Sequence, residues 1–286
     1  MDWLWLTLAG VAAGVLGGLL GVGGATIMLP AMLLVLGKQY TGILGFHHPP
    51  YEGIQQYQAA SLVVVSLLIL PSVKIHWKNK TIWTGVLKWL VPAALIGGVA
   101  GVALGAVPWL SGENTAVMRY VMGIFFLYVA ADNIRRLLAP GITDGVLRET
   151  TEAYPWWRKG LVGLLMGVSA GLLGIGGGAI AVPAQQTILR MPLRNSIATS
   201  AAAILCTGWA FAIFKNAALP GIYGHADTGQ LTYWQHSLLL AALFTPTSVL
   251  GGYIGGHLTH RLPLKWVRAT FIALMIFSAL KAFSVF

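Results

Sequence analysis

GGLLGVGGATIMLPA at residues 17–31 and AGLLGIGGGAIAVPA at residues 170–184 are two copies of one pattern, and they align without a gap. Each copy is apolar and contains a glycine cluster, Gly21-Val-Gly-Gly24 in the first and Gly174-Ile-Gly-Gly-Gly178 in the second. The correspondence continues downstream, where Ala60-Ser61 occupies the place of Thr199-Ser200. We infer a duplicated chain, with residues 1–138 as the first membrane repeat and residues 159–286 as the second.

The composition is typical of a membrane protein. Hydrophobic residues make up 57% of the chain and charged residues only 9%, whereas soluble domains carry roughly 25% charged residues. A soluble fold is therefore excluded, and the lipid bilayer is an expected partner. The net charge of +10 comes from basic residues that stand between apolar runs instead of forming one patch, so no nucleic-acid partner is expected.

Eight apolar runs follow one another along the chain, and most have the roughly 20 residues that a spanning helix needs. They cover about 3–36, 57–73, 82–107, 116–138, 160–189, 194–218, 233–258 and 263–285. Residues 139–158 form the most polar stretch and are expected to be a cytoplasmic linker. No Lys or Arg precedes the first run and no small-residue cleavage site follows soon after it, so we expect no cleaved signal peptide.

The Lys and Arg residues in the loops and near the ends of the runs indicate how many runs cross the membrane, because basic residues gather on the cytoplasmic side. If all eight runs cross, ten of these residues lie on one side and seven on the other. If runs one and five turn back at their glycines, thirteen lie on one side and four on the other, the four being Lys38, Arg119, Lys215 and Lys281. The second arms, residues 25–37 and 179–189, are also too short to cross about 30 Å at about 1.5 Å per residue.

The predicted fold is an all-α membrane protein with two inverted-topology repeats. Each repeat consists of a glycine-broken re-entrant helical hairpin and three transmembrane helices, in the arrangement of many secondary transporters. The positive-inside rule then places both termini outside a cell inner membrane. The sequence leaves the oligomeric state open, with a homodimer as one alternative.

The two glycine tips form the predicted binding site. In both hairpins the second arm begins at the tip, so two helix N-termini would converge, each with about half a positive charge and free N–H donors. Such a pair would bind a small anion without a fixed cation, and the deep segments contain almost no cations. The predicted substrate-binding residues are the tip glycines and nearby polar residues: Gly23, Gly24, Thr26, Ser61, Gly176, Gly177, Gly178, Gln185, Asn195, Thr199 and Ser200.

Purely structural roles are the alternative for every one of these residues. Glycines also permit a tight bend or a close helix contact, and hydroxyl and amide side chains also bond neighbouring helices or the preceding turn of their own helix. The glycines Gly97, Gly101 and Gly105, and likewise Gly251 and Gly255, recur at every fourth position and are expected to serve close helix packing only.

The repeated motifs resemble the TauE/SafE sulfite exporter family. They are GVGGATIMLP at residues 21–30, GIGGGAIAVP at residues 174–183, and the segment from Pro192 through Ala198-Thr199-Ser200. The resemblance spans nearly the whole chain and implies transport, not catalysis, of sulfite, thiosulfate, sulfoacetate or related organosulfonates. The first half departs from the family pattern at Ala25-Thr26 and Ala60-Ser61, so its contribution to binding is less defined.

Two other functions remain as alternatives. Gly167-Val-Ser-Ala-Gly171 matches the nucleophile elbow of serine hydrolases, which would make Ser169 the nucleophile of a membrane-embedded hydrolase. That motif requires a strand, a turn and a helix, whereas this stretch is an apolar helix, so helix packing is the preferred interpretation. An anion channel of the same architecture is the second alternative.

No metal or cofactor is expected. His257 and His260 stand three residues apart and His47-His48 are adjacent, but no Cys, Asp or Glu lies nearby in the sequence to complete a set of metal ligands.

Overall fold

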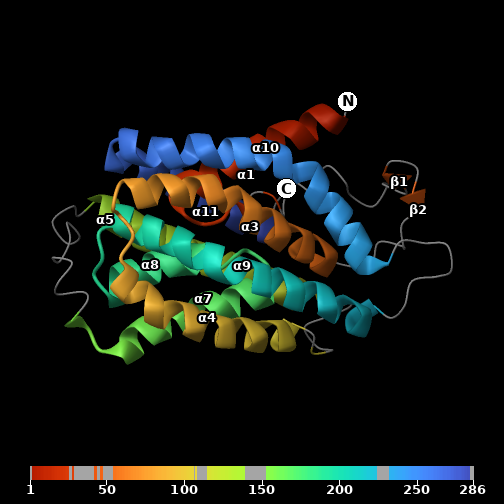
Figure 1. The fold of residues 1–286 in the computed structure, drawn as a ribbon, viewed down its shortest axis with the longest axis horizontal. Coiled ribbons are helices and arrows are strands. Elements are labelled where there is room, and N and C mark those ends of the chain that lie inside the picture. Colours follow the sequence, from red (N-terminus) through yellow and green to blue (C-terminus); the bar gives the residue numbers. More distant parts are fainter. Residues whose placement is uncertain are drawn as a thin grey trace.

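The computed structural model describes residues 2–25, 28, 42–43, 46–47, 54–105, 107, 115–138, 153–223 and 232–283 of the 286-residue chain. Most of them are helical (Figure 1), so the predicted all-α class is confirmed. The helices are α1 (Asp2–Leu20), α3 (Ile54–Lys78), α4 (Thr84–Gly105), α5 (Thr115–Leu138), α7 (Trp156–Leu173), α8 (Gly178–Ile188), α9 (Leu193–Tyr223), α10 (Tyr233–Arg261) and α11 (Leu264–Ala282). Within these ranges the strands β1 (Gly42–Ile43) and β2 (Phe46–His47) pair in one small antiparallel hairpin.

Among the described residues, four helices are long and apolar enough to cross a bilayer. These segments are Gln55–Lys78, Thr84–Gly105, Leu193–Gly221 and Tyr233–Arg261. Their outer faces carry large exposed apolar side chains such as Ile96, Ile213 and Leu250. Such surfaces are stable against lipid and not against water, so the chain is a multi-pass membrane protein.

Runs one and five are each interrupted at the predicted glycines. Helix α1 ends at Leu20, and α7 ends at Leu173. In the segments that follow, which we call the first tip (Gly21–Gly24) and the second tip (Gly174–Gly177), three of the four residues are glycines with φ between +63° and +88°. This left-handed conformation is costly for any residue with a side chain larger than the hydrogen of glycine. The helices therefore end where the glycines cluster.

The last glycine of each tip lies against the backbone of the helix that leads into that tip. A Cβ atom built on Gly24 would lie 2.5 Å from the carbonyl oxygen of Ala13, and one built on Gly177 would lie 2.5 Å from that of Met166. In the sequence alignment Gly24 corresponds to Gly177 and Ala13 to Met166, so both turns have the same geometry.

Each half packs its first helix against a helix of the other half. Helix α1 lies along α10, and α7 lies along α4 (Figure 1). The contacts are backbone to backbone, because Cβ atoms on the glycines of one helix would overlap carbonyl oxygens of the other. The glycines concerned are Gly97, Gly101, Gly163, Gly167 and Gly171 in the α4–α7 pair, and Gly14, Gly18, Gly251 and Gly255 in the α1–α10 pair. The predicted close packing is therefore confirmed for Gly97, Gly101, Gly251 and Gly255. Gly105 makes no such close contact, since the nearest backbone atom to a Cβ there would be the Leu172 carbonyl oxygen at 3.7 Å.

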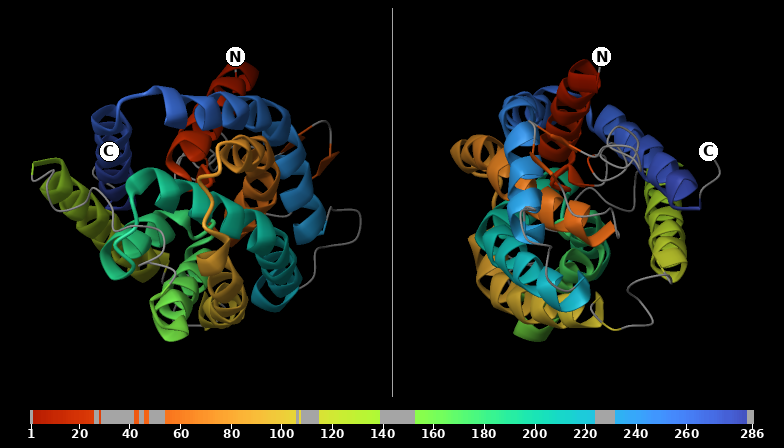
Figure 2. Two further views of the ribbon diagram at one scale, coloured as in Figure 1. Left: turned by 60° about the vertical axis from the view of Figure 1, so that its left-hand side comes forward. Right: turned by 90° about the vertical axis from the view of Figure 1, so that its right-hand side faces the viewer.

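Helices α3 and α9 lie against each other and connect these pairs, since α3 also contacts α10 and α9 also contacts α4. Helices α5 and α11 form a third pair, which flanks the rest of the helices in the right-hand view of Figure 2. The two tips therefore lie among α1, α3, α7 and α9, away from the outer surface.

Candidate functional site

The two glycine tips meet in the interior of the protein. Gly178, which directly follows the second tip, lies against the backbone of Gly21 and Val22, and a Cβ atom on Gly178 would be 2.7 Å from the Cα atom of Val22. Every residue of both tips is buried. The structure thus brings together the predicted glycines Gly23, Gly24, Gly176, Gly177 and Gly178.

Two aligned serines hold the tips in place. Ser61 Oγ on α3 donates a hydrogen bond of 2.8 Å to the carbonyl oxygen of Gly174, and Ser200 Oγ on α9 donates one of 3.0 Å to that of Gly21. Each hydroxyl therefore binds the tip of the opposite half. Ser61 Oγ also lies 2.9 Å from the Gln58 carbonyl oxygen of its own helix, so its single hydrogen has two acceptors in range. Both serines nevertheless contact the opposite tip in this conformation.

Two aligned apolar side chains cover both tips. A Cβ atom on Gly23 would lie 2.7 Å from Val65 Cγ1, and one on Gly176 would lie 3.0 Å from the same atom. Ile204 Cδ1 also lies against both segments, because it would be 3.5 Å from a Cβ atom on Gly23 and 2.9 Å from one on Gly178. Val65 and Ile204 each follow the aligned serines by four residues, so the tips are closed from two related directions.

A helix begins directly after each tip. The backbone N–H of Ala181 donates to the Gly177 carbonyl at 2.9 Å, and the N–H of Met28 donates to the Gly24 carbonyl at 3.0 Å. These bonds join aligned positions, so both second arms start with the same turn. The first N–H groups of a helix have no acceptor within it, and the start of α8 at Gly178 lies beside Gly21 and Val22 of the opposite tip. Thr26 lies outside the described residues.

Asn195 and Thr199 do not reach the tips. Asn195 Nδ2 donates to the carbonyl oxygen of Thr81 at 2.9 Å, and Thr199 Oγ1 accepts from the N–H of Trp83 at 3.1 Å. Both side chains are therefore engaged by the connection between α3 and α4, where they satisfy backbone groups at the start of α4. For these two residues the geometry favours a structural role.

Gln185 lies on α8, seven residues after Gly178, which is about 10 Å along a helix. Its side chain is fully buried, and neither its amide nitrogen nor its amide oxygen has a hydrogen-bond partner among the described residues. A buried amide without partners costs about 1–3 kcal/mol per group. Gln185 therefore remains a candidate for ligand contact, although it is distant from the tips themselves.

The largest difference from the sequence analysis concerns Lys215, which the charge count placed at the outer side of the membrane. The residue belongs to α9 and its side chain is fully buried. It lies close to the second tip, because Nζ donates a hydrogen bond of 3.3 Å to the carbonyl oxygen of Gly171. The burial of Lys215 could have been predicted from its position within the predicted run 194–218.

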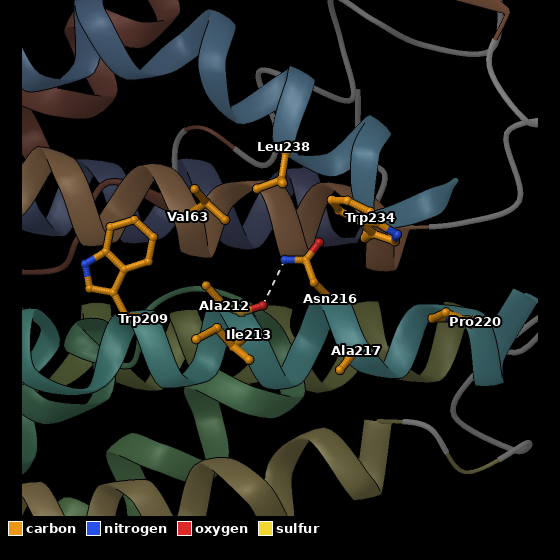
Figure 3. Close-up of a pocket in the computed structure, with 9 residues that line it drawn as sticks. All are labelled: Val63, Trp209, Ala212, Ile213, Asn216, Ala217, Pro220, Trp234 and Leu238. Atoms are coloured by element: carbon orange, nitrogen blue, oxygen red, sulfur yellow. Dashed lines mark hydrogen bonds between the residues drawn. The ribbon is translucent and has the colours of Figure 1, made fainter. Parts of the chain in front are cut away.

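A separate pocket of about 310 Å³ opens between α3, α9 and α10 (Figure 3). Apart from Asn216, whose side chain donates to the Ala212 carbonyl of its own helix at 2.8 Å, its lining is apolar and includes Trp209 and Trp234. None of the predicted binding residues lines it. An apolar surface of this kind suits lipid chains better than an anion.

Comparison with known families gives an independent result. The family model described as "Sulfite exporter TauE/SafE" matches residues 6–282. The chain belongs to the TauE/SafE family. The match includes both glycine tips and all helices from α3 to α11, so the architecture described above is that of a TauE/SafE protein.

Several curated proteins resemble this TauE/SafE chain. "Probable membrane transporter protein MamO" of Paramagnetospirillum magneticum is 26% identical over 307 residues, which cover 98% of this chain and 44% of that protein. The probable membrane transporter proteins YunE and YjnA of Bacillus subtilis are 25% and 29% identical, with 93% of this chain and 92% and 95% of theirs covered. The chain thus spans less than half the length of MamO. No solved structure matches the chain.

Of the histidines considered in the sequence analysis, His260 pairs with His76, which was not among them. His76 Nδ1 on α3 lies 2.9 Å from His260 Nε2 on α10, which is the length of a direct hydrogen bond. Among the described residues of this TauE/SafE protein, no third His, Cys, Asp or Glu joins them. The ring of His257 instead contacts the ring of Tyr253, with centroids 4.7 Å apart.

Proposed function

We propose that this protein transports a small sulfur-containing anion, such as sulfite, thiosulfate or an organosulfonate, across the cell inner membrane. The observation that carries the proposal is the contact between the two glycine tips, at Gly178 and Gly21. A helix N-terminus follows each tip, and the partial positive charges and N–H donors of two such ends favour an anion. Membership of the sulfite exporter family supports the choice of a sulfur oxyanion.

The proposal includes an inverted repeat of two re-entrant hairpins with three spanning helices in each half. The reciprocal packing of α1 on α10 and of α7 on α4 supports it, as do the equivalent bonds of Ser61 and Ser200 to the opposite tips. The charge count favours both termini outside and the linker 139–158 in the cytoplasm.

Transport requires that the tips open, because Val65 and Ile204 cover them in this conformation. The glycine-packed pairs α1–α10 and α4–α7 have continuous backbone contacts, which favours movement of each pair as a unit. We propose that these two pairs rock against each other around the tips, which exposes the site to each side of the membrane in turn.

Purified protein is expected to be stabilised by its anionic substrate, because a ligand that binds only the folded state adds about 2.7 kcal/mol at 100 times its dissociation constant. Thermal melting in detergent with sulfite, thiosulfate, sulfate and sulfonates would identify it. The anion that stabilises most should also show saturable flux in proteoliposomes. Flux that rises linearly with concentration would instead indicate a channel, and the absence of both stabilisation and flux would refute the proposal.

The hydrolase alternative predicts a different result for Ser169. In the structure this residue lies within the continuous helix α7, and its Oγ donates to the Met166 carbonyl at 2.8 Å. Ser169→Ala removes one bond within the helix and is expected to change stability by less than about 1 kcal/mol. Anion flux should equal that of the wild type, and loss of an ester-hydrolase activity in this variant would support the alternative.

A further inference from the structure

Lys215 places a cationic side chain at the ends of two helices beside the second tip. Its Nζ atom binds the carbonyl oxygen of Gly171, one turn before the end of α7. The same atom would be 3.4 Å from a Cβ built on Gly105, the last residue of α4. The C-terminal ends of helices carry partial negative charge, so this position can hold an ammonium group.

Comparison with the first half indicates that a hydrogen bond to the Gly171 carbonyl does not require a charged donor. Gly18 is the residue aligned with Gly171, and its carbonyl oxygen accepts from Ser72 Oγ at 3.1 Å and from Thr259 Oγ1 at 3.4 Å. Neutral hydroxyls therefore satisfy the equivalent group. An ammonium group at Lys215 is more costly to bury than a hydroxyl, so its presence calls for an additional explanation.

Within the described part of the chain, no carboxylate forms an ion pair with Lys215, and its hydrogen bond to Gly171 is long at 3.3 Å. A fully buried ammonium is stable only when a negative charge and further hydrogen bonds compensate for its lost hydration. A small anion bound beside it would supply both.

Two buried glutamines of α3 lie at the C-terminal ends of the same two helices, Gln55 at the end of α4 and Gln58 just after the end of α7. Gln55 Nε2 donates to the Gly105 carbonyl at 2.8 Å, which leaves its Oε1 without a partner. Gln58 packs directly on Gly174 and is fully buried, and neither of its amide atoms has a partner among the described residues. An ammonium together with amide N–H donors is a suitable set of groups for oxyanion recognition.

We propose that Lys215 is a substrate-binding residue, whose ammonium group is the fixed positive charge that binds the transported oxyanion beside the second tip. Gln58 completes this side of the site with its amide N–H group. The inference rests on the proposed function and deepens it, because it makes the two halves unequal: the aligned position in the first half, also 15 residues after the serine, is His76. The second half then dominates binding.

The test uses full-length protein in liposomes of phosphatidylethanolamine and phosphatidylglycerol, with radiolabelled sulfite and thiosulfate as probes. Lys215→Met keeps the length of the side chain and removes its charge. We expect a loss of about 10- to 100-fold in the ratio of maximal flux to half-saturating concentration, since hydrogen bonds to charged groups are among the strongest. The stabilisation by anion should disappear, while the melting temperature without anion should not fall, because an apolar side chain replaces a buried charge.

Lys88→Met is the matched control. Lys88 is exposed on α4, where its Nζ lies 5.6 Å from the centre of the Trp89 ring, and its replacement should leave flux and anion stabilisation unchanged. Wild-type flux and wild-type anion stabilisation in Lys215→Met would overturn the inference while the proposed function stands. Failure of the wild type to bind or transport any tested anion would refute both.

A second pair of variants covers the case in which Lys215→Met does not fold. Lys215→Arg retains the charge, and Lys215→Gln retains only hydrogen bonding. Higher flux in the arginine variant than in the glutamine variant is the expected result, because only the former can balance the anion. Equal flux in the two would show that Lys215 serves helix packing alone.

Discussion

Gly178→Ala is expected to abolish transport while the protein still folds. Gly178 has an ordinary helical φ and so tolerates a side chain locally, but its added methyl group would overlap the carbonyl oxygen of Gly21 on the opposite tip. Overpacking of this kind costs about 1–3 kcal/mol, which the protein can relieve only by moving the tips apart. Flux in proteoliposomes should fall at least about tenfold, since each 1.4 kcal/mol corresponds to about a factor of ten.

The control for this variant is Gly160→Ala on α7 of the same half, where the nearest atom to the new methyl group would be Ala93 Cβ at 3.9 Å. Its flux should match that of the wild type. Anion stabilisation should be measured for both variants in detergent. If Gly178→Ala transports and binds anion normally, the contact between the tips is not the binding site.

Gly167→Leu is expected to prevent assembly of the fold. Gly167 lies in the middle of the α4–α7 contact, and a Cβ atom there would overlap the carbonyl oxygen of Ala94 and lie 2.7 Å from the backbone nitrogen of Gly98. Neither atom can move without displacing a helix. We expect destabilisation of at least about 3 kcal/mol, at the upper end of overpacking effects, with little monodisperse protein after detergent extraction.

The corresponding control is Gly221→Leu near the end of α9, because no atom from another part of the described structure lies within 4 Å of a Cβ at that position. Size-exclusion chromatography and thermal melting would compare the two variants with the wild type. Normal yield and melting of Gly167→Leu would contradict the close backbone packing of the α4–α7 pair.

Much of the fold follows from local sequence signals. Apolar runs predicted the helices, and the glycine clusters predicted where α1 and α7 end, since positive φ angles are costly for any other residue. The repeat alignment also indicated that Ser61 and Ser200 are equivalent. Their hydrogen bonds to opposite tips could not be predicted, because contacts between segments more than a hundred residues apart depend on how the helices pack.

The polar residues of the candidate site were less predictable for the same reason. Asn195, Thr199 and Ser200 are neighbours on one helix, yet only Ser200 faces a tip, while the other two bind the connection before α4. Lys215 was assigned to a boundary because charged residues usually mark the ends of membrane segments. Lys215 is buried because it packs against the ends of α4 and α7. The sequence of α9 alone does not indicate that these helix ends lie beside it.

Helices α1 and α4 of the first half both pack against helices of the second half, and this affects how the protein assembles during synthesis. When residues 1–138 have left the ribosome, α1 and α4 are both present, but α10 and α7, the helices that cover their glycine faces, have not yet been synthesised. Exposed small-residue faces associate readily with other helices in a membrane. The first half therefore cannot complete its packing until the second half has been synthesised. Protection of its glycine faces by an insertase or chaperone during that interval would determine how much of the protein assembles correctly.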